Sequence, residues 1–232
     1  MKVSVLFSGG KDSTHAVWYC TKQGWEIETL IAVKPASDEA YIWHYPTVEW
    51  TCLIAEALNA KLILLECNDI GPAEEVKILE RIIPALESDA LILGGVGLQE
   101  TQINVVRKIA EKHGLQVFVP FEDYKSEQLL REEIESGLEI VITEVAAGGL
   151  TKEFLGKKIT KENFNEFKNL AEKHGFDVLG EGGAYNTFVT DAPFFAKKIL
   201  FGEQEVVWDE KTRSGHLLVK NAFLVNKIKT VV

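Results

Sequence analysis

The sequence predicts an α/β protein: a doubly wound, five-stranded parallel sheet, followed by a smaller α+β domain. Three observations support this prediction. Short apolar runs alternate with helical patterns over the first half, a glycine-rich loop joins the first run to the first helix, and period-two alternation dominates the C-terminal end. Right-handed crossover helices between strands produce a parallel sheet with helices on both faces.

The first strand is predicted at 3–7, where the run V-S-V-L-F is apolar and partly β-branched. The glycine-rich loop follows directly. The helix after it includes 14–20 and is expected to stop at Gly24, because glycine favours the left-handed conformation that ends helices. The order is therefore strand, glycine loop, helix.

The same alternation continues to Pro120. Further strands are predicted at 26–33, 61–66, 90–93 and 115–119, and apolar residues recur at helical spacing over 50–58, 76–86 and 103–110. Pro84 is expected to kink or break the second of these helices near Ile83. Ligands in such sheets bind outside the carboxyl ends of the strands, which places the glycine loop on the binding rim.

A change of character after Pro120 predicts two domains, 1–122 and 123–232. In the second, Ser126 is predicted to cap a helix with Leu129, Leu130 and Ile134 turned inward. A strand at 138–145, two further helices and antiparallel strands or hairpins after residue 198 complete it.

Composition restricts the classes of function. The 232 residues include 46% hydrophobic ones, with no apolar run near the roughly 20 residues of a membrane span and no signal-peptide pattern, which favours a cytoplasmic protein. The charge of −10, without a visible basic stripe, argues against a nucleic-acid partner. The three cysteines, Cys20, Cys52 and Cys67, form no C-x-x-C pair and are predicted to be buried free thiols.

The glycine loop has the composition of an anion site. It reads Ser8-Gly9-Gly10-Lys11-Asp12-Ser13. The first N–H groups of the following helix are unpaired and carry the positive end of its dipole, Lys11 adds a cation, and Ser8 and Ser13 add hydroxyl donors. Asp12 can brace the loop, cap the helix or reach a metal. The common phosphate loop requires Ser or Thr after its lysine, so this loop belongs to another class.

The pattern S-G-G-x-D-S between a strand and a helix resembles the PP-loop of the N-type ATP pyrophosphatases. This resemblance implies that ATP, with Mg²⁺, is split between its α and β phosphates, and that the AMP half activates a carboxyl or carbonyl oxygen. It also implies nucleotide contacts at the ends of the second and fourth strands, where we expect Ala32, Val33, Gly94 and Gly95 to contribute. Each of these four fits a plain loop position equally well.

A second unusual stretch begins at Gly180. It contains three glycines around one carboxylate, two directional hydrogen-bonding side chains and a second carboxylate, and we predict a substrate site made of Glu181, Gly182, Gly183, Tyr185, Asn186, Thr187 and Asp191. The alternative is a turn between two strands. His44, in the aromatic loop 41–46, is a further candidate for contacting substrate or phosphate, with a purely structural histidine as the alternative.

The loop, the block G-G-L-T-K-E-F-L-G-K-K-I at 148–159 and the segment G-E-G-G-A-Y-N-T-F-V-T-D-A-P-F-F at 180–195 together resemble the diphthine–ammonia ligase family. The resemblance implies a carbon–nitrogen ligase that amidates diphthine on elongation factor 2 to diphthamide, using ATP and ammonium and releasing AMP and diphosphate. It implies catalytic roles for Lys11, Asp12 and Glu181. A homo-oligomer is compatible with this interpretation.

The family's usual motif reads E-G-G-E-[FY]-E-[TS], and Ala184 and Asn186 stand here in place of two glutamates. This departure leaves the substrate open, and three alternatives to the diphthine interpretation stay open. The first is a PP-loop amidoligase acting on another carboxylate, for example a corrinoid-related one. The second is an ATP-binding regulatory protein without ligase activity. The third is a tRNA-modifying adenylylase, which the acidic composition disfavours.

Overall fold

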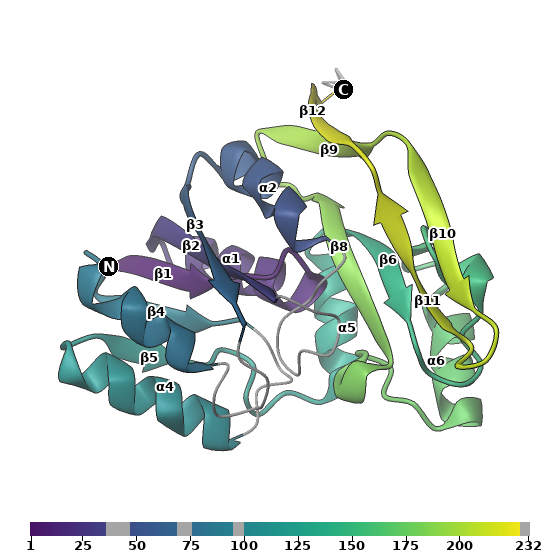
Figure 1. Ribbon diagram of the computed structural model, residues 1–232, viewed down its shortest axis with the longest axis horizontal. Helices are drawn as coiled ribbons and strands as arrows, with labels where there is room; N and C mark the ends of the chain where they lie inside the picture. Colours follow the sequence, from purple (N-terminus) through teal and green to yellow (C-terminus); the bar gives the residue numbers. More distant parts are fainter. Residues whose placement is uncertain (36–46, 69–75, 95–99, 228–232) are drawn as a thin grey trace.

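The computed structural model describes residues 1–35, 47–68, 76–94 and 100–227. Its first half is the predicted five-stranded parallel sheet, in the order β3-β2-β1-β4-β5 (Figure 1). The strands are β1 (Lys2–Leu6), β2 (Glu26–Pro35), β3 (Lys61–Cys67), β4 (Ala90–Leu93) and β5 (Gln116–Phe118). Because β1 is central and the chain turns outward on both sides of it, the sheet is doubly wound, as the sequence predicts.

Helices cover both faces of this sheet. They are α1 (Lys11–Lys22), η1 (Val48–Trp50), α2 (Thr51–Leu58), η2 (Val76–Arg81), η3 (Ile83–Ala85) and α4 (Glu100–Lys112). Strand β4 illustrates the two layers, because side chains of a strand alternate between faces. Ala90 and Ile92 pack in the same core as α1 and α2, whereas Leu91 and Leu93 pack with η2, η3 and α4.

The segment after β3 differs from the prediction. The helix expected over 76–86 is a pair of short 3₁₀ segments, η2 and η3, that meet at Ile82 and Ile83. Pro84 lies in the first turn of η3, where its missing N–H costs no helical hydrogen bond. The predicted break near Ile83 is therefore confirmed, but the type of helix was wrong.

The second half is a smaller, antiparallel system. Its sheet has the order β10-β11-β6-β7, with β8 paired to β6, and β9 pairs with β12. The elements are α5 (Ser126–Glu135), β6 (Glu139–Val145), η4 (Lys152–Phe154), β7 (Lys158–Ile159), α6 (Phe164–His174), η5 (Glu181–Gly183), β8 (Tyr185–Asp191), β9 (Lys197–Phe201), β10 (Gln204–Asp209), β11 (Ser214–Val219) and β12 (Ala222–Asn226). The antiparallel strands predicted near the C-terminus are confirmed.

One hydrophobic core joins the two halves. Val3 and Val17 of the first half belong to the same buried cluster as Leu130 and Phe188 of the second. Strand β8 lies against the start of α1, as Figure 1 shows, and the N–H of Val189 donates to the carbonyl of Gly9 at 2.9 Å. The parallel sheet of the first half and the antiparallel strands of the second half therefore pack directly against each other.

Two local predictions require correction. Cys20 and Cys67 are buried, but Cys52 is exposed on α2, because its position on that helix faces away from the sheet. Ser126 is the first residue of α5 rather than its cap, and its hydroxyl donates to the Asp177 carboxylate at 2.7 Å. The residue in the cap position is Lys125.

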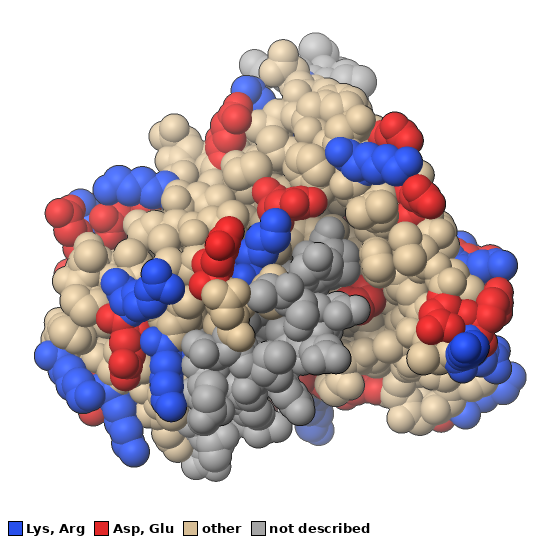
Figure 2. Space-filling model, viewed as in Figure 1, with Lys and Arg blue, Asp and Glu red and all other residues tan. Residues whose placement is uncertain are grey.

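The surface carries charges of both signs. On the face drawn in Figure 2, acidic and basic side chains are interspersed, and neither sign forms a continuous stripe there. Within the described ranges, no helix combines the length and apolarity needed to cross a bilayer.

Candidate active site

The glycine loop connects β1 to α1 and has a conformation that only glycine accepts at Gly9. The φ angle of Gly9 is +82°, and a Cβ there would lie 2.8 Å from Cε2 of Phe188. Gly10 is the N-cap residue of α1, in an extended conformation. The backbone of the loop therefore fits closely against β8 at the positive end of α1.

The two serines of the loop fold it upon itself. Ser13 Oγ donates to the Gly10 carbonyl at 3.1 Å and accepts from the Ser8 N–H at 3.3 Å, and the two hydroxyl oxygens are 3.2 Å apart. The Gly10 N–H donates to Ser8 Oγ at 3.3 Å. These contacts hold the loop in shape, while Asp12 and Ser13, the second and third residues of α1, have N–H groups without partners inside the helix.

The second predicted motif meets the first. The N–H of Lys11 donates to Oγ1 of Thr187 at 3.1 Å, across 176 residues of sequence. A Cβ on Gly10 would lie 3.2 Å from the Thr187 carbonyl oxygen. The start of β8 and the start of α1 therefore form one surface.

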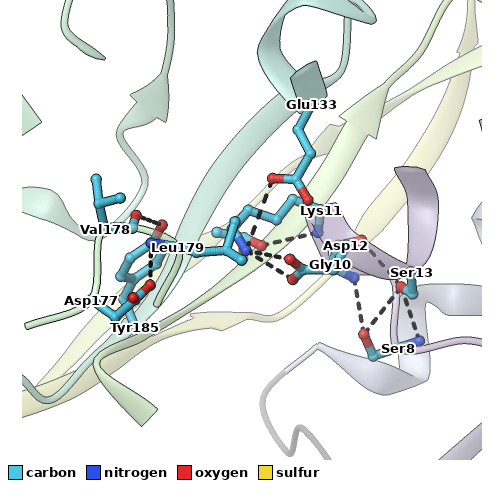
Figure 3. Close-up of polar contacts among 11 residues, drawn as sticks. Ser8, Gly10, Lys11, Asp12, Ser13, Glu133, Asp177, Val178, Leu179 and Tyr185 are labelled. Atoms are coloured by element: carbon cyan, nitrogen blue, oxygen red, sulfur yellow. Dashed lines mark hydrogen bonds and ion pairs between the residues drawn. The ribbon is translucent and has the colours of Figure 1, made fainter. Parts of the chain in front are cut away.

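A buried charge cluster lies beside this contact, centred on Lys11 (Figure 3). Lys11 Nζ is 2.8 Å from both carboxylate oxygens of Asp12 and 4.0 Å from the nearer carboxylate oxygen of Glu133. The side chains of Lys11 and Glu133 are 4% and 0% exposed. Burial opposes the charge on Lys11, but the carboxylates of Asp12 and Glu133 more than offset it and raise its pKa.

Glu133 is the member that the sequence did not reveal. It projects from α5, and among the described residues neither carboxylate oxygen has a hydrogen-bond partner. Burial raises the pKa of Glu133 well above its usual range, and the neighbouring Asp12 carboxylate adds to this effect, while Lys11 opposes it. The pattern does contain a signal: residue 133 is four positions after Leu129 and three after Leu130, on the same inward face.

Tyr185 lies beside Lys11 (Figure 3), and Glu181 is near enough for its charge to act on Lys11. Glu181 is partly buried, and its pKa is raised first by burial and next by the charge of Asp12. Tyr185 is 3% exposed, its hydroxyl donates to the Val178 carbonyl at 2.6 Å, and Lys11 Nζ lies 5.8 Å from the centre of its ring. Tyr185 therefore offers the cluster an aromatic face, because its hydroxyl is already used.

The loop that carries Glu181 is held in place by Asp177. The Asp177 carboxylate accepts hydrogen bonds from Ser126 Oγ on α5, at 2.7 Å, and from the Leu179 N–H, at 2.8 Å. Gly180 has a φ of +92°, and a Cβ there would lie 2.9 Å from the Tyr185 carbonyl oxygen. Gly182 and Gly183 are exposed and also have positive φ values.

Three predicted substrate residues are positioned differently. Thr187 contacts the loop, as described. Asn186 turns to β6, where its Nδ2 donates to Glu144 Oε2 at 2.5 Å. Asp191 lies at the opposite end of β8, 2.7 Å from Lys227 Nζ. Asp191 lies six positions after Tyr185 along an extended strand, about 20 Å away, so the structure does not bring Asp191 to the cluster.

The predicted nucleotide contacts divide into two groups. Ala32 and Val33 are buried within β2, and Gly94 follows β4 and packs against α1, where a Cβ would lie 2.8 Å from the Ser13 Cα. Gly94 thus belongs to the rim next to the glycine loop. Gly95 and His44 lie outside the described residues.

Two family models match the chain, one in each half. Family models described as the N-terminal and C-terminal domains of diphthamide synthase match residues 1–117 and 125–225. The chain belongs to the diphthamide synthase family. Relatives named diphthine–ammonia ligase include those of Bos taurus, 33% identical over 89% of this chain and 85% of that protein, and Homo sapiens, 31% identical over the same shares. The resemblance stated from the sequence is confirmed.

Other relatives extend this picture of the diphthamide synthase family. The diphthine–ammonia ligase of Danio rerio is 32% identical, with 89% of each chain covered. Among solved structures, a predicted subunit of a tRNA methyltransferase from Methanocaldococcus jannaschii covers 83% of this chain and 98% of its own, with 17% identity and a TM-score of 0.44. That similarity is below the level that shows a shared fold.

Proposed function

We propose that this chain is an ATP-dependent amide ligase that converts diphthine on elongation factor 2 to diphthamide, with ammonia as nitrogen donor and AMP and diphosphate as products. The contact between Lys11 and Thr187 is the observation that carries the proposal. It joins an anion-binding helix end to a partly buried carboxylate loop, in a family whose relatives are named diphthine–ammonia ligase.

The first step is adenylylation. A carboxylate oxygen of the substrate attacks the α-phosphorus of ATP, an O–P bond forms, and the bond to diphosphate breaks. The unpaired N–H groups at the start of α1 and the dipole of that helix would face the phosphates. Gly9 allows the backbone to approach closely, and the Ser8–Ser13 hydroxyl contact preorganises the loop.

The second step is amidation. Ammonia attacks the acyl carbon, a C–N bond forms, the C–O bond to AMP breaks, and one proton is released. Glu181, which is partly buried and whose pKa is raised, is the candidate acceptor for this proton. Water competes with ammonia for the adenylate, so burial of the site beside Lys11 and Tyr185 favours the amide.

The donor set also fits Mg²⁺. This ion prefers oxygen ligands and is usually held by one or two carboxylates together with substrate phosphates. Glu181 would supply such a carboxylate during the first step, before it accepts a proton in the second, whereas both oxygens of Asp12 are paired with Lys11. When bound, Mg²⁺ would neutralise part of the charge on the phosphates.

A second candidate function is amidation of another carboxylate, such as a corrinoid-related acid. Ala184 and Asn186 favour it, because each replaces a glutamate of the usual motif. Ala184 is buried, and its carbonyl accepts the N–H groups of Ala146 and Ala147, while Asn186 is engaged with Glu144. Neither position presents a carboxylate to a substrate cation.

The test is to incubate the protein with Mg-ATP, ammonium and elongation factor 2 that carries diphthine, and to weigh the factor by mass spectrometry while AMP is assayed. We expect the factor to lose the mass difference between a hydroxyl and an amino group, with one AMP formed for each conversion. An unchanged factor under conditions where ATP binds would overturn the diphthine assignment and favour a different carboxylate.

A further inference from the structure

The surroundings of Lys11 Nζ form a cage for a small cation. The cage consists of the Asp12 carboxylate at 2.8 Å, the Glu133 carboxylate at 4.0 Å and the ring of Tyr185, whose centre is 5.8 Å away (Figure 3). Carboxylates and an aromatic face are the groups that bind ammonium-type cations in proteins. Lys11 Nζ is itself a substituted ammonium group, and its position shows that an ammonium-type cation fits the cage.

Lys11 does not use the full capacity of the cage. A direct charge-assisted N–H···O contact is about 2.7–2.9 Å long, and the distance from Lys11 to Glu133 is well beyond that range. Among the described residues, neither oxygen of Glu133 has a hydrogen-bond partner, although the side chain is completely buried. A buried carboxyl group without such partners is costly to the folded state, and a cation placed beside it would favour its charged form. This indicates a role that a second cation would complete.

Glu133 is also firmly placed. It lies on α5 next to Leu129 and Leu130, which are both fully buried, and the Ser126 hydroxyl ties the first turn of that helix to Asp177 in the loop before Glu181. Its carboxylate therefore cannot turn to solvent without moving α5. The three elements that pack together here, α1, α5 and β8, therefore hold the cage residues in fixed positions.

We propose that Glu133, with Asp12 and the ring of Tyr185, binds an ammonium ion at the position of Lys11 Nζ when Lys11 reaches toward the phosphates of ATP. This ion loses one proton to the Glu133 carboxylate to give the ammonia that attacks the acyl carbon, and the second proton leaves as the amide forms. An ammonium ion has four N–H donors and no side chain that limits its position, so it can donate to Asp12 and Glu133 at the same time, whereas Lys11 is 4.0 Å from Glu133. This inference rests on the proposed ligase function and names the site of its second substrate.

The kinetic test compares E133Q with wild type and with E135Q, which changes an exposed glutamate of the same helix. For E133Q we expect kcat/KM for ammonium to fall at least about tenfold, because a charge-assisted contact is lost. Hydroxylamine is neutral at neutral pH, so its conversion to a hydroxamate should stay at the wild-type level. An equal loss with both nucleophiles would overturn the proposal.

A binding test separates this inference from the proposed function. Melting temperatures are measured with an ATP analogue that cannot be cleaved between its α and β phosphates, in ammonium chloride and in sodium chloride of equal ionic strength. We expect ammonium to raise the melting temperature of wild type and E135Q but not of E133Q, whether or not ligation is observed. A rise of equal size in E133Q contradicts the ammonium site.

E133D serves if E133Q does not fold, because aspartate retains the carboxylate at a shorter reach. E133D should show a smaller rise in melting temperature than wild type, and a rise of the same size as in wild type contradicts the site.

Discussion

The backbone N–H of Lys11 and the hydroxyl of Thr187 are joined by a hydrogen bond of 3.1 Å that closes 176 residues of sequence. Lys11 begins the helix after the glycine loop, and Thr187 lies in the strand that follows the Glu181 loop. The two predicted motifs are therefore halves of one candidate site. The predictions below test that site and the charges buried beside it.

Removing the Thr187 hydroxyl should weaken both the fold and ATP binding. T187V keeps the shape of the side chain but leaves the Lys11 N–H without its acceptor, which we expect to lower the free energy of unfolding by about 1–3 kcal/mol. Urea denaturation and calorimetric titration with Mg-ATP measure the two effects. T187S retains the hydroxyl and should behave as wild type, and equal behaviour of T187V and T187S would contradict the role of the contact.

An alanine at Gly9 should abolish ATP binding, because its Cβ would lie 2.8 Å from a ring carbon of Phe188 and push the loop from β8. G24A is the matched control: Gly24 also has a positive φ, of +71°, but a Cβ there meets nothing within 4 Å. Both variants carry the backbone strain of about 1–2 kcal/mol. ATP affinity should be lost only in G9A, and retention of normal affinity in G9A would refute the close contact.

His15 should make the fold less stable as the pH falls. It is buried between Trp18 and Phe121, and burial lowers its pKa from 6.5 to about 4. Between these values the unfolded chain binds a proton that the folded chain does not, so the free energy of unfolding decreases as the pH falls through this window, by at most about 3 kcal/mol. Above this pH window, the histidine is neutral in both states and the free energy of unfolding is not reduced.

The variant H15F isolates this effect. Phenylalanine retains the ring contacts with Trp18 and Phe121 but cannot titrate. Urea denaturation of both proteins across the window should give a smaller decrease in stability for H15F than for wild type. Parallel curves for the two proteins would show that His15 is not held neutral in the folded state.

Replacing Asn186 by aspartate should destabilise the fold, because its side chain contacts the Glu144 carboxylate. N186D would place a second carboxylate where the amide now donates at 2.5 Å, and the two negative charges would repel each other in the folded state. The resulting loss of stability should be present at neutral pH and should be relieved as the pH falls, because protonation then favours the folded state. Melting temperatures at neutral and mildly acidic pH measure this, with N186D/E144Q as the control that restores stability. An N186D protein as stable as wild type at neutral pH would argue that Asn186 and Glu144 are not coupled.

Local patterns in the sequence predicted much of this fold. The strand, glycine loop and helix at the N-terminus, the alternation of strands and helices up to Pro120 and the antiparallel strands near the C-terminus follow from periodicity and turn residues within short windows. The extent of individual elements depends on tertiary packing. Residues 76–85 carry apolar side chains at helical spacing, yet Pro84 and the packing of Ile78 and Ile83 on the sheet favour 3₁₀ turns.

The site was predictable only in its separate parts. Each motif is visible in the sequence, but the hydrogen bond between Lys11 and Thr187 depends on the pairing of β8 with β6, which no local pattern encodes. Glu133 was missed because it stands among other glutamates of α5, and only the packing of that helix buries one of them. Asp191 was included because it is near Glu181 in sequence, although an extended strand carries it away from the cluster.

The central claim is that a substrate carboxylate becomes an adenylate at the loop held by β8. The most direct measurement uses elongation factor 2 whose diphthine carboxylate is labelled with heavy oxygen, together with Mg-ATP and ammonium. If the carboxylate attacks the α-phosphorus, one labelled oxygen must pass to the phosphate of AMP as the amide forms. Label in inorganic phosphate, or amide formation with unlabelled AMP, would contradict this account.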